Sequence, residues 1–433
     1  MKAETHSAPE MSGSSQSGAP GDERKTSDLT DLADTLVSRL DELGKVSDEE
    51  PRLVRTFLSP ASARANALVG GWMRGAGLNV REDAWGNLWG SRPGPPGSRT
   101  LLIGSHLDTV VDAGRFDGPA GVLLGIAVAR AVAEADLPFG LEVVGFSDEE
   151  GVRFQSTYLG SRGCLGLLTP AELALTDDDG IRLGDLIEVR RRAGFSDAVL
   201  EAGNLLGYLE MHIEQGPVLE AENLPLAVVP GIAGQTRILA GFTGKAGHAG
   251  TTPMALRHDA LTAAARMVTE AETLARDTPG LLATVGKLEV APGAGNVIPG
   301  ACSFTLDVRS PDNNIRLRAV EDLENLGSAL ARERGLAWHW EIKQSNPAVP
   351  CDAALTTRLA EAAAADQPRV PCLFSGAGHD AAVFAGSCPA AMLFIRCRGG
   401  LSHHPDEFAS PEDLAAALRA AVRFVLNLAE KPL

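Results

Sequence analysis

The sequence predicts an α/β fold in which a mixed, largely parallel sheet is flanked by helices and a smaller α+β unit is inserted into the chain. Apolar runs at 101–103 and 141–146 flank a helical stretch at 122–135, and strands joined by such a crossover pair in parallel. The pattern of predicted strands and helices changes near residue 222 and changes back near residue 345. A length of 433 residues also exceeds the size at which one hydrophobic core keeps growing. Two folding units are therefore expected.

The N-terminal segment reads as a tail followed by two helices. Residues 1–27 are rich in Ser, Gly and Pro and lack the apolar core of a secretory signal, so we expect a disordered tail. Apolar residues recur at helical spacing over 28–44, which predicts an amphipathic helix. A second helix should begin at Ser59-Pro60, where a capping residue precedes the residue best tolerated at the first helical position.

The first part of the larger domain is assigned to residues 28–221. A hairpin is expected around Gly86-Asn87, and a strand over 100–106 opens the β-loop-α-β unit described above. A helix over 183–193 ends in three consecutive arginines, Arg190 to Arg192, which we expect to be a solvated helix end. An apolar strand then runs from 204 to His212.

The inserted α+β unit is assigned to residues 222–344. Its ends lie in polar or Pro-bearing segments, which tolerate insertion. The larger domain resumes over 345–433. The inserted unit is expected to contain strands 227–229, 237–242, 281–290, 302–308 and 336–343 with helices 259–275 and 314–333, and the last part helix 353–365, strand 391–396 and helix 411–428.

Composition limits the classes of function. The formal net charge of −17 argues against binding to nucleic acid and to anionic membrane surfaces. No apolar run is long enough to span a bilayer. The six cysteines form no C-x-x-C pair, which argues against a zinc ribbon and favours reduced thiols in a cytoplasmic protein.

Acidic residues and a histidine collect where the predicted strands end. His106 and Asp108 lie two residues apart, so their side chains leave an extended strand end on the same face. Asp117 follows in a glycine-flanked loop, and Asp148, Glu149 and Glu150 follow the next strand. The alternative is a solvated acidic loop after each strand. Because ligands bind at this edge of open α/β sheets, we favour a site.

Two further histidines, His212 and His403, end or follow apolar runs. With His106, Asp117 and Glu150 they could bind two divalent ions if Asp117 bridges them. Mixed imidazole and carboxylate ligands suit Zn²⁺ first, with Mn²⁺, Co²⁺ or Ni²⁺ possible. Adjacent residues point to opposite sides, so one of Glu149 and Glu150 could bind metal while the other moves protons. The residues alone do not say which.

Nine motifs occur in the order expected of one enzyme family: HLDTV, FDG, DEEG, HIEQG, GHAGTTPM, NVIPG, DVRS, GAGHDA and SHHPDE. In this respect residues 28–430 resemble the M20-type dinuclear metallohydrolases of the hydantoinase/carbamoylase family. The resemblance implies one ion held by His106, Asp117 and His212, and a second held by Asp117, Glu150 and His403. It also implies Glu149 as general base and acid, Asp108 as the partner of His106, and a cis peptide at Asp117-Gly118.

The resemblance further implies that the inserted unit is a lid and dimerisation domain. His248 would stabilise the oxyanion, while Asn296 and Arg309 would bind a substrate carboxylate, in some relatives at the partner subunit's site. An arginine fork matches a carboxylate, and a donor placed where charge develops lowers the barrier. Gln215 would be a polar contact to the ureido group, and His379 would be another residue of the substrate pocket.

Each of these roles has a structural alternative. His212 could be a hydrogen-bonded core imidazole, His248 a loop tip without function, and His379 a structural hydrogen-bonding residue. Arg309 could simply pair with Asp307. His404 competes with His403 as the last ligand, but the family places that ligand directly after Ser, as in Ser402-His403.

The expected function is that of a cytoplasmic, homodimeric amidohydrolase that cleaves a linear ureido C–N bond in a carboxylate-bearing small molecule. The GAGHDA motif is typical of allantoate enzymes, whereas GIAGQ and Phe394-Ile395-Arg396 are typical of carbamoylases, so the choice between N-carbamoyl-L-amino acids, allantoate and ureidopropionate stays open. The alternatives are an M20-type aminoacylase or peptidase and a catalytically silent metal-binding scaffold.

Overall fold

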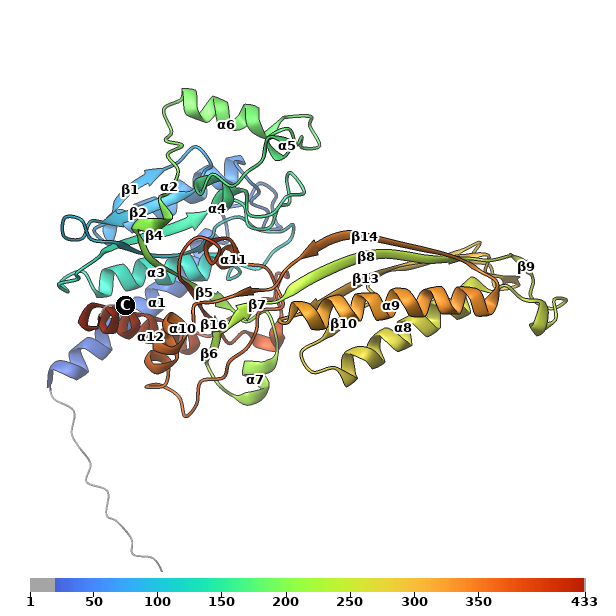
Figure 1. Ribbon diagram of the computed structural model, residues 1–433. Helices are drawn as coiled ribbons and strands as arrows, with labels where there is room; N and C mark the ends of the chain where they lie inside the picture. The colour runs from blue at the N-terminus through green and yellow to red at the C-terminus, as the bar shows by residue number, and fades with distance from the viewer. Residues whose placement is uncertain (1–19, 432–433) are drawn as a thin grey trace, which may run out of the picture.

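The computed structural model describes residues 20–431. Figure 1 shows a larger body, built from both ends of the chain, from which a long arm extends. We call residues 234–346 the arm. The chain enters and leaves the arm through two short strands that pair with each other, β7 (Gly231–Ile232) and β15 (Val349–Pro350).

The body is organised around a seven-stranded mixed sheet. Its four central strands are parallel, and the hairpin at one edge and the single strand at the other edge are antiparallel to their neighbours. The predicted fold class is confirmed. In spatial order the strands are β1 (Asn79–Glu82), β2 (Leu88–Arg92), β4 (Gly140–Phe146), β3 (Thr100–His106), β5 (Leu205–Ile213), β16 (Ala390–Ile395) and β6 (Leu226–Val229).

Helices cover both faces of this sheet. The larger core lies under five long helices, to which strand residues such as Ile103 and Leu209 also contribute. A second core on the opposite face joins Phe146 and Tyr208 of the sheet to Phe384 of α11 (Asp380–Phe384). The five long helices are α1 (Pro20–Leu43), α2 (Pro60–Gly75), α3 (Pro119–Ala131), α10 (Ala353–Ala363) and α12 (Pro411–Glu430).

A small peripheral layer lies beside the hairpin. It contains α4 (Leu159–Cys164), α5 (Pro170–Leu173) and α6 (Leu183–Arg192), the last two at the upper end of the body in Figure 1. The expectation of a solvated helix end is wrong for Arg190. This guanidinium donates to the carbonyl oxygens of Asp83 and Ala84, pairs with Glu82 and lies over the ring of Phe195.

The arm is a second, antiparallel sheet with two helices on one face. In β13, residues alternate between buried and half-buried, so Phe304, Leu306 and Val308 point toward the helices while Asp307 and Arg309 lie on the uncovered face. The main elements are β8 (Gly234–Thr243), α8 (Ala260–Asp277), β10 (Leu282–Thr284), β11 (Leu288–Ala291), β13 (Ala301–Ser310), α9 (Asn313–Arg334) and β14 (Ala337–Asn346).

Three expectations need correction. Residues 226–229, which the pattern assigns to the inserted unit, form β6 and pair with β16 in the larger sheet. The strand expected over 281–290 is two strands, β10 and β11. Of the expected tail, residues 20–27 belong to α1, whereas residues 1–19 lie outside the described residues. In the described chain, no helix has both the length and the apolar character needed to cross a membrane.

A glycine in α3 permits the close packing that holds the sheet near its functional edge. A Cβ atom at Gly121 would overlap the carbonyl oxygen of Met211 in β5, whereas one at Gly71, an exposed glycine of α2, would meet no atom within 4 Å. We expect Gly121→Ala to lower the free energy of unfolding by about 1–3 kcal/mol because the helix must shift. Gly71→Ala should raise it by about 0.5–1 kcal/mol. Urea unfolding of both variants tests this, and equal effects would contradict it.

Candidate metal centre

The carboxyl ends of the central parallel strands bring the predicted ligands together. His106 is the last residue of β3, His212 lies near the end of β5, and Glu149 and Glu150 follow β4. His403 lies in the loop after β16, with a positive φ of 56°. Asp117 immediately precedes the turn into α3. The five predicted ligands, which are distant in sequence, thus converge because parallel strands end at the same edge of a sheet.

His106, Asp117 and His212 form the first group of possible metal ligands. The Oδ1 atom of Asp117 lies 3.4 Å from Nε2 of His106 and 3.1 Å from Nε2 of His212. All three side chains are buried. Burial alone would raise the pKa of Asp117, but His106 and His212, through the positive charge and the hydrogen bonds of their protonated rings, hold it well below its usual value.

Asp117, Glu150 and His403 form the second group. The Nε2 atom of His403 lies 3.5 Å from Oδ2 of Asp117 and 3.3 Å from Oε1 of Glu150. Asp117 therefore presents one carboxylate oxygen to each group, as a bridging ligand requires. The side chain of His403 is half exposed, which leaves this side of the centre open to solvent.

The hydrogen bonds of the histidines fit metal binding. Nδ1 of His106 lies 3.1 Å from the carbonyl oxygen of Asp108, and Nδ1 of His212 lies 2.9 Å from that of Ile213. Since a carbonyl only accepts, each Nδ1 carries a proton, and in the neutral ring the Nε2 lone pair faces Asp117. Oδ1 of Asp117 has no hydrogen-bond partner among the described residues. A cation between these atoms would satisfy all three ligands.

Asp108 connects the first histidine to the two glutamates. Its carboxylate accepts the backbone N–H groups of Glu149 and Glu150 at 3.0 and 3.1 Å, and lies 3.4 Å from Nδ1 of His106. The side chain therefore positions both the end of β3 and the loop after β4. This arrangement matches the positioning role expected for Asp108.

Glu149 has the environment expected of a proton-transfer group. It is buried, and one of its oxygens forms a third group of possible metal ligands with His106 and Glu150. Burial raises the pKa of Glu149 well above its ordinary value, and the charges of Glu150 and Asp380 add to this while His106 opposes it. A carboxyl group with a raised pKa is a stronger base than an ordinary carboxylate, which suits a group that accepts a proton and then returns it.

Two polar residues outside the predicted site also hold Asp117. Oε1 of Glu407 accepts the backbone N–H groups of Phe116 and Asp117 at 2.8 and 2.9 Å, while Ser402 donates to Oδ2 of Asp117. Burial raises the pKa of Glu407 to about 7, and the charge of Asp117 contributes. Both residues belong to the SHHPDE motif, so the motif was the signal from which they could have been found. The loop of Asp117 that they contact lies 290 residues from Glu407 in the sequence.

Gln215 and His379, the predicted ureido contact and the predicted pocket residue, lie beside the centre. Gln215 donates to Oδ2 of Asp117 at 2.8 Å, and its Oε1 is buried without a hydrogen-bond partner among the described residues. His379 packs edge-on against the ring of His212 and shares a 2.8 Å hydrogen bond with Ser375. Burial holds the pKa of His379 well below its usual value, so its ring is neutral.

The remaining predicted residues lie on the arm. Arg309 pairs with Asp307, the contact anticipated as its alternative, and also donates to the carbonyl oxygen of Gly376 in the body. His248 lies in β9 (Gly247–His248), and Asn296 immediately precedes β12 (Val297–Ile298), which pairs with β9. Figure 1 places β9 at the far end of the arm. The structure therefore does not bring His248 and Asn296 to the metal centre of their own chain.

The expected cis peptide is wrong. The cis bonds of residues 20–431 are Glu50-Pro51 and Ala291-Pro292, so Asp117-Gly118 is trans. The turn into α3 is made instead by Gly118, whose φ is +83°. A Cβ atom there would overlap the ring of His106, so the position also requires glycine for space.

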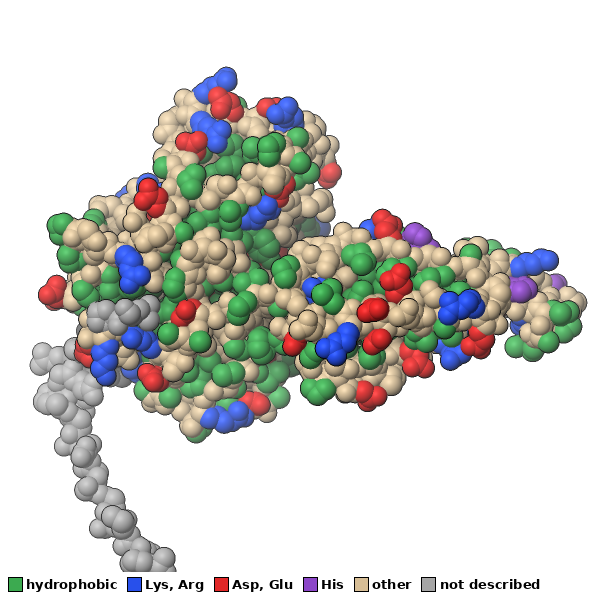
Figure 2. All heavy atoms as spheres, viewed as in Figure 1, with side chains coloured by type: hydrophobic (Ala, Val, Ile, Leu, Met, Phe, Trp, Pro, Cys, Tyr) green, Lys and Arg blue, Asp and Glu red, His purple; other side chains and the backbone are tan. Residues whose placement is uncertain are grey.

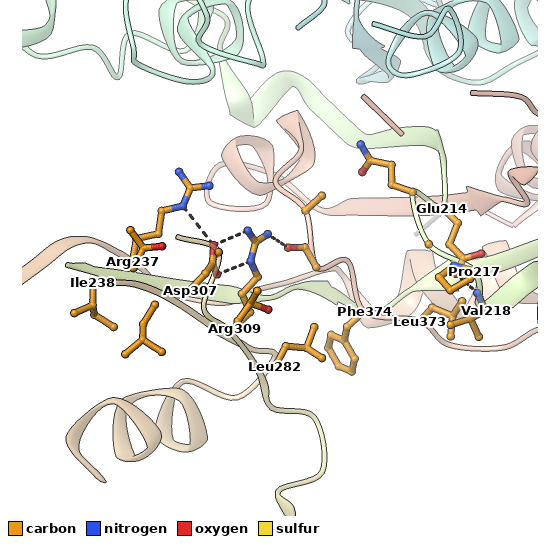
Figure 3. Close-up of a pocket in the computed structure, with 18 of the residues that line it drawn as sticks. Glu214, Pro217, Val218, Arg237, Ile238, Leu282, Asp307, Arg309, Leu373 and Phe374 are labelled. Carbon is orange, nitrogen blue, oxygen red and sulfur yellow. Dashed lines mark hydrogen bonds and ion pairs between the residues drawn. The ribbon is translucent and has the colours of Figure 1, made fainter. Parts of the chain in front are cut away.

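A pocket of about 1100 Å³ lies in the angle between the arm and the body. Figure 3 shows Arg237, Asp307 and Arg309 on its arm side, with Leu282 and Phe374 nearby. Gln215, Gly376 and Ala377 also line it, which connects the pocket to the metal centre. Its size is sufficient for a small organic acid.

Glu407 is expected to control metal affinity because it holds the backbone on both sides of the bridging carboxylate. Glu407→Ala leaves two buried N–H groups without an acceptor and should weaken metal binding about 10–100-fold. Glu407→Gln retains a carbonyl oxygen and should retain more affinity. Calorimetric metal titration measures this, with the exposed Glu361→Ala as control. Wild-type affinity in the alanine variant would contradict the assigned role.

Comparison with known proteins identifies the family of the chain. The model of peptidase family M20/M25/M40 matches residues 102–427. The chain is 42% identical to a probable allantoate deiminase of Oryza sativa subsp. japonica, over 91% of this chain and 88% of that protein. It is 37% identical to an N-carbamoyl-L-amino-acid amidohydrolase of Pseudomonas sp. (strain NS671), over 90% of this chain and 96% of that protein.

Solved structures lead to the same family. An amidase of the hydantoinase/carbamoylase family from Burkholderia multivorans superposes with a TM-score of 0.87 at 32% identity, covering 93% of this chain and 98% of that one. A family member from Burkholderia ambifaria gives a TM-score of 0.84 at 34% identity, covering 92% and 97%. With its sheet, its ligand cluster and a family match over most of its length, the chain belongs to peptidase family M20/M25/M40.

Proposed function

We propose that this protein is a metal-dependent amidohydrolase that cleaves a linear ureido or carbamoyl C–N bond in a carboxylate-bearing small molecule. One observation carries the proposal: two ligand groups share Asp117, and a buried glutamate that is not needed by either group lies beside them. The relatives named as allantoate deiminases and N-carbamoyl-L-amino-acid amidohydrolases support this class of reaction.

Two divalent ions fit the residues present. His106, Asp117 and His212 would hold one ion, and Asp117, Glu150 and His403 the other. Imidazole and carboxylate donors favour Zn²⁺, with Mn²⁺, Co²⁺ and Ni²⁺ also compatible. Such a pair, when bound, polarises the ureido carbonyl and lowers the pKa of water to about 7.

The side chains around the ions divide the remaining work. Glu149 accepts the proton of the attacking water and returns it to the departing nitrogen, which its raised pKa permits. Asp108 fixes the loop that carries Glu149. Neutral His379 and Gln215 offer polar contacts to the ureido group, and Arg309 binds the carboxylate. For an N-carbamoyl amino acid the products are the amino acid, carbon dioxide and ammonia.

A homodimer would complete the site. His248 is exposed at the end of the arm, and its Nδ1 accepts the N–H of Gly250 at 3.0 Å, so the neutral ring presents an Nε2–H donor outward. Met254 and Leu256 are 76% and 67% exposed in the following segment. Figure 2 shows hydrophobic and histidine side chains gathered at this end of the molecule. Two chains joined through their arms would bring His248 and Asn296 to the partner subunit's metal centre.

A cytoplasmic location is also part of the proposal. All six cysteines are free, with four of them buried. Burial raises the pKa of the thiols of Cys164, Cys388 and Cys397, which keeps them protonated and unreactive. Such thiols suit a reducing compartment.

The reaction is tested by ammonia release from N-carbamoyl-L-amino acids and allantoate. Glu149→Gln removes the proton acceptor but not a proposed ligand, so we expect kcat to fall about 10²–10⁴-fold with metal content unchanged. Exhaustive dialysis against a chelator should abolish turnover of the wild type, and added Zn²⁺ or Mn²⁺ should restore it. Full activity of the Gln variant, or rates unaffected by the chelator, would refute the mechanism.

The shared site is tested by mixing two inactive variants. His248→Ala retains Glu149, and Glu149→Gln retains His248, so each mixed dimer contains one site with both groups intact. We expect reassembly of an equal mixture to restore about a quarter of wild-type activity, because half of the dimers are mixed and each has one intact site. Either variant alone is the control. A mixture no more active than its components would indicate that each chain uses its own His248.

A further inference from the structure

Four polar residues form a cluster on the uncovered face of the arm sheet, at the wall of the pocket. The carboxylate of Asp307 is its centre. Arg309 donates to Asp307 through two nitrogens at 2.8 and 2.9 Å, Gln235 donates at 2.8 Å, and Nε of Arg237 lies 3.5 Å from the same carboxylate. Figure 3 shows the two arginines next to each other around Asp307.

The hydrogen bonds of Arg309 leave a binding surface free. A guanidinium has five N–H groups. The carboxylate of Asp307 accepts one N–H group from Nε and one from a terminal nitrogen. The carbonyl oxygen of Gly376 accepts one N–H group from the other terminal nitrogen. One N–H remains on each terminal nitrogen. Asp307 thus orients Arg309 while leaving it two donors for a carboxylate.

Arg237 has more uncommitted N–H donors than Arg309. Asp307 is its recorded partner within residues 20–431, and the contact uses only Nε. Its side chain is 56% exposed, and it lines the pocket. Because both arginines contact Asp307, their guanidinium groups are neighbours. A ligand held by Arg309 therefore has a second group of donors within reach.

The net charge of the cluster indicates which kind of substrate group the N–H donors of Arg237 bind. Two arginines and one aspartate leave one positive charge, which a single substrate carboxylate balances. Lys343 in the same pocket is already paired with Glu341, and the carboxylate of Glu214 is occupied by the N–H groups of Val218 and Leu219. A second carboxylate would be uncompensated, so a neutral hydrogen-bond acceptor suits Arg237 best.

We propose that Arg237 determines specificity by binding the carbonyl oxygen of a second ureido group, carried on the same carbon as the substrate carboxylate. This inference rests on the proposed function and selects, within it, diureido acids such as allantoate over N-carbamoyl amino acids with aliphatic side chains. A site that hydrogen-bonds a substrate group discriminates against analogues lacking it. Arg237 contacts only the part of the substrate that does not react.

The test compares kcat/KM for allantoate and N-carbamoyl-L-alanine in the wild type and three variants. We expect the wild type to prefer allantoate. Arg237→Gln should lower its kcat/KM for allantoate about 10–100-fold, mainly through KM, and that for N-carbamoyl-L-alanine less than about threefold. Arg237→Lys, which keeps the charge but not the fork, should lose an intermediate amount. Arg276→Gln, an exposed arginine of α8 paired with Glu272, is the matched control and should change neither.

Binding to the Glu149→Gln variant separates this inference from the proposed function. Calorimetry should show tighter binding of allantoate than of N-carbamoyl-L-alanine, and adding Arg237→Gln should remove the difference. That result would support the role of Arg237 even if no turnover were found. Equal losses for both ligands on substitution of Arg237, or a wild-type preference for N-carbamoyl-L-alanine, would overturn the inference.

Discussion

The burial of several carboxylates at one edge of the sheet is the constraint on which the site depends. Asp117, Asp148 and Glu149 are each at least 90% shielded from solvent, and an uncompensated buried charge is costly. Burial raises the pKa of Asp148 and Glu149 well above their usual values, with neighbouring carboxylates adding to the shift. The imidazole groups of the histidines compensate part of this buried negative charge. Divalent cations bound between Asp117 and the histidines would compensate the remaining charge and would then contribute to the stability of the folded protein.

The scaffold keeps these groups in place through backbone contacts. Asp108 fixes the loop after β4, and Glu407 fixes the loop before α3, each by accepting two N–H groups. Free loops would not keep the site carboxylates at fixed positions relative to one another. Loops that are attached to the ends of four parallel strands do so. Close helix packing contributes, since Gly121 lets α3 approach the backbone of β5 next to His212. The same contacts that complete the core therefore position the ligands.

The arm carries residues that the proposed function assigns to substrate binding and to the partner subunit's site. Its uncovered face presents Arg309 and Arg237 to the pocket, while its far end carries His248 away from the centre of the same chain. The bond between Arg309 and the carbonyl oxygen of Gly376 connects the arm to the loop that bears His379. A substrate carboxylate bound at Arg309 would therefore lie between the two units. In the proposed dimer, the second chain supplies the histidine donor that is absent from the metal centre of this chain.

The sequence by itself determined the parallel unit, the helix caps and the ligand types, because these follow from local periodicity and from motifs. Ser59 caps α2 as expected, and His106 ends β3. Only the tertiary structure decided which distant groups meet. Glu407 contacts Asp117, and Arg190 contacts the hairpin. The strand β6 joins the larger sheet by pairing with β16, which lies more than 160 residues further along the chain. Such contacts depend on how strands are ordered in a sheet, and local sequence does not encode that order.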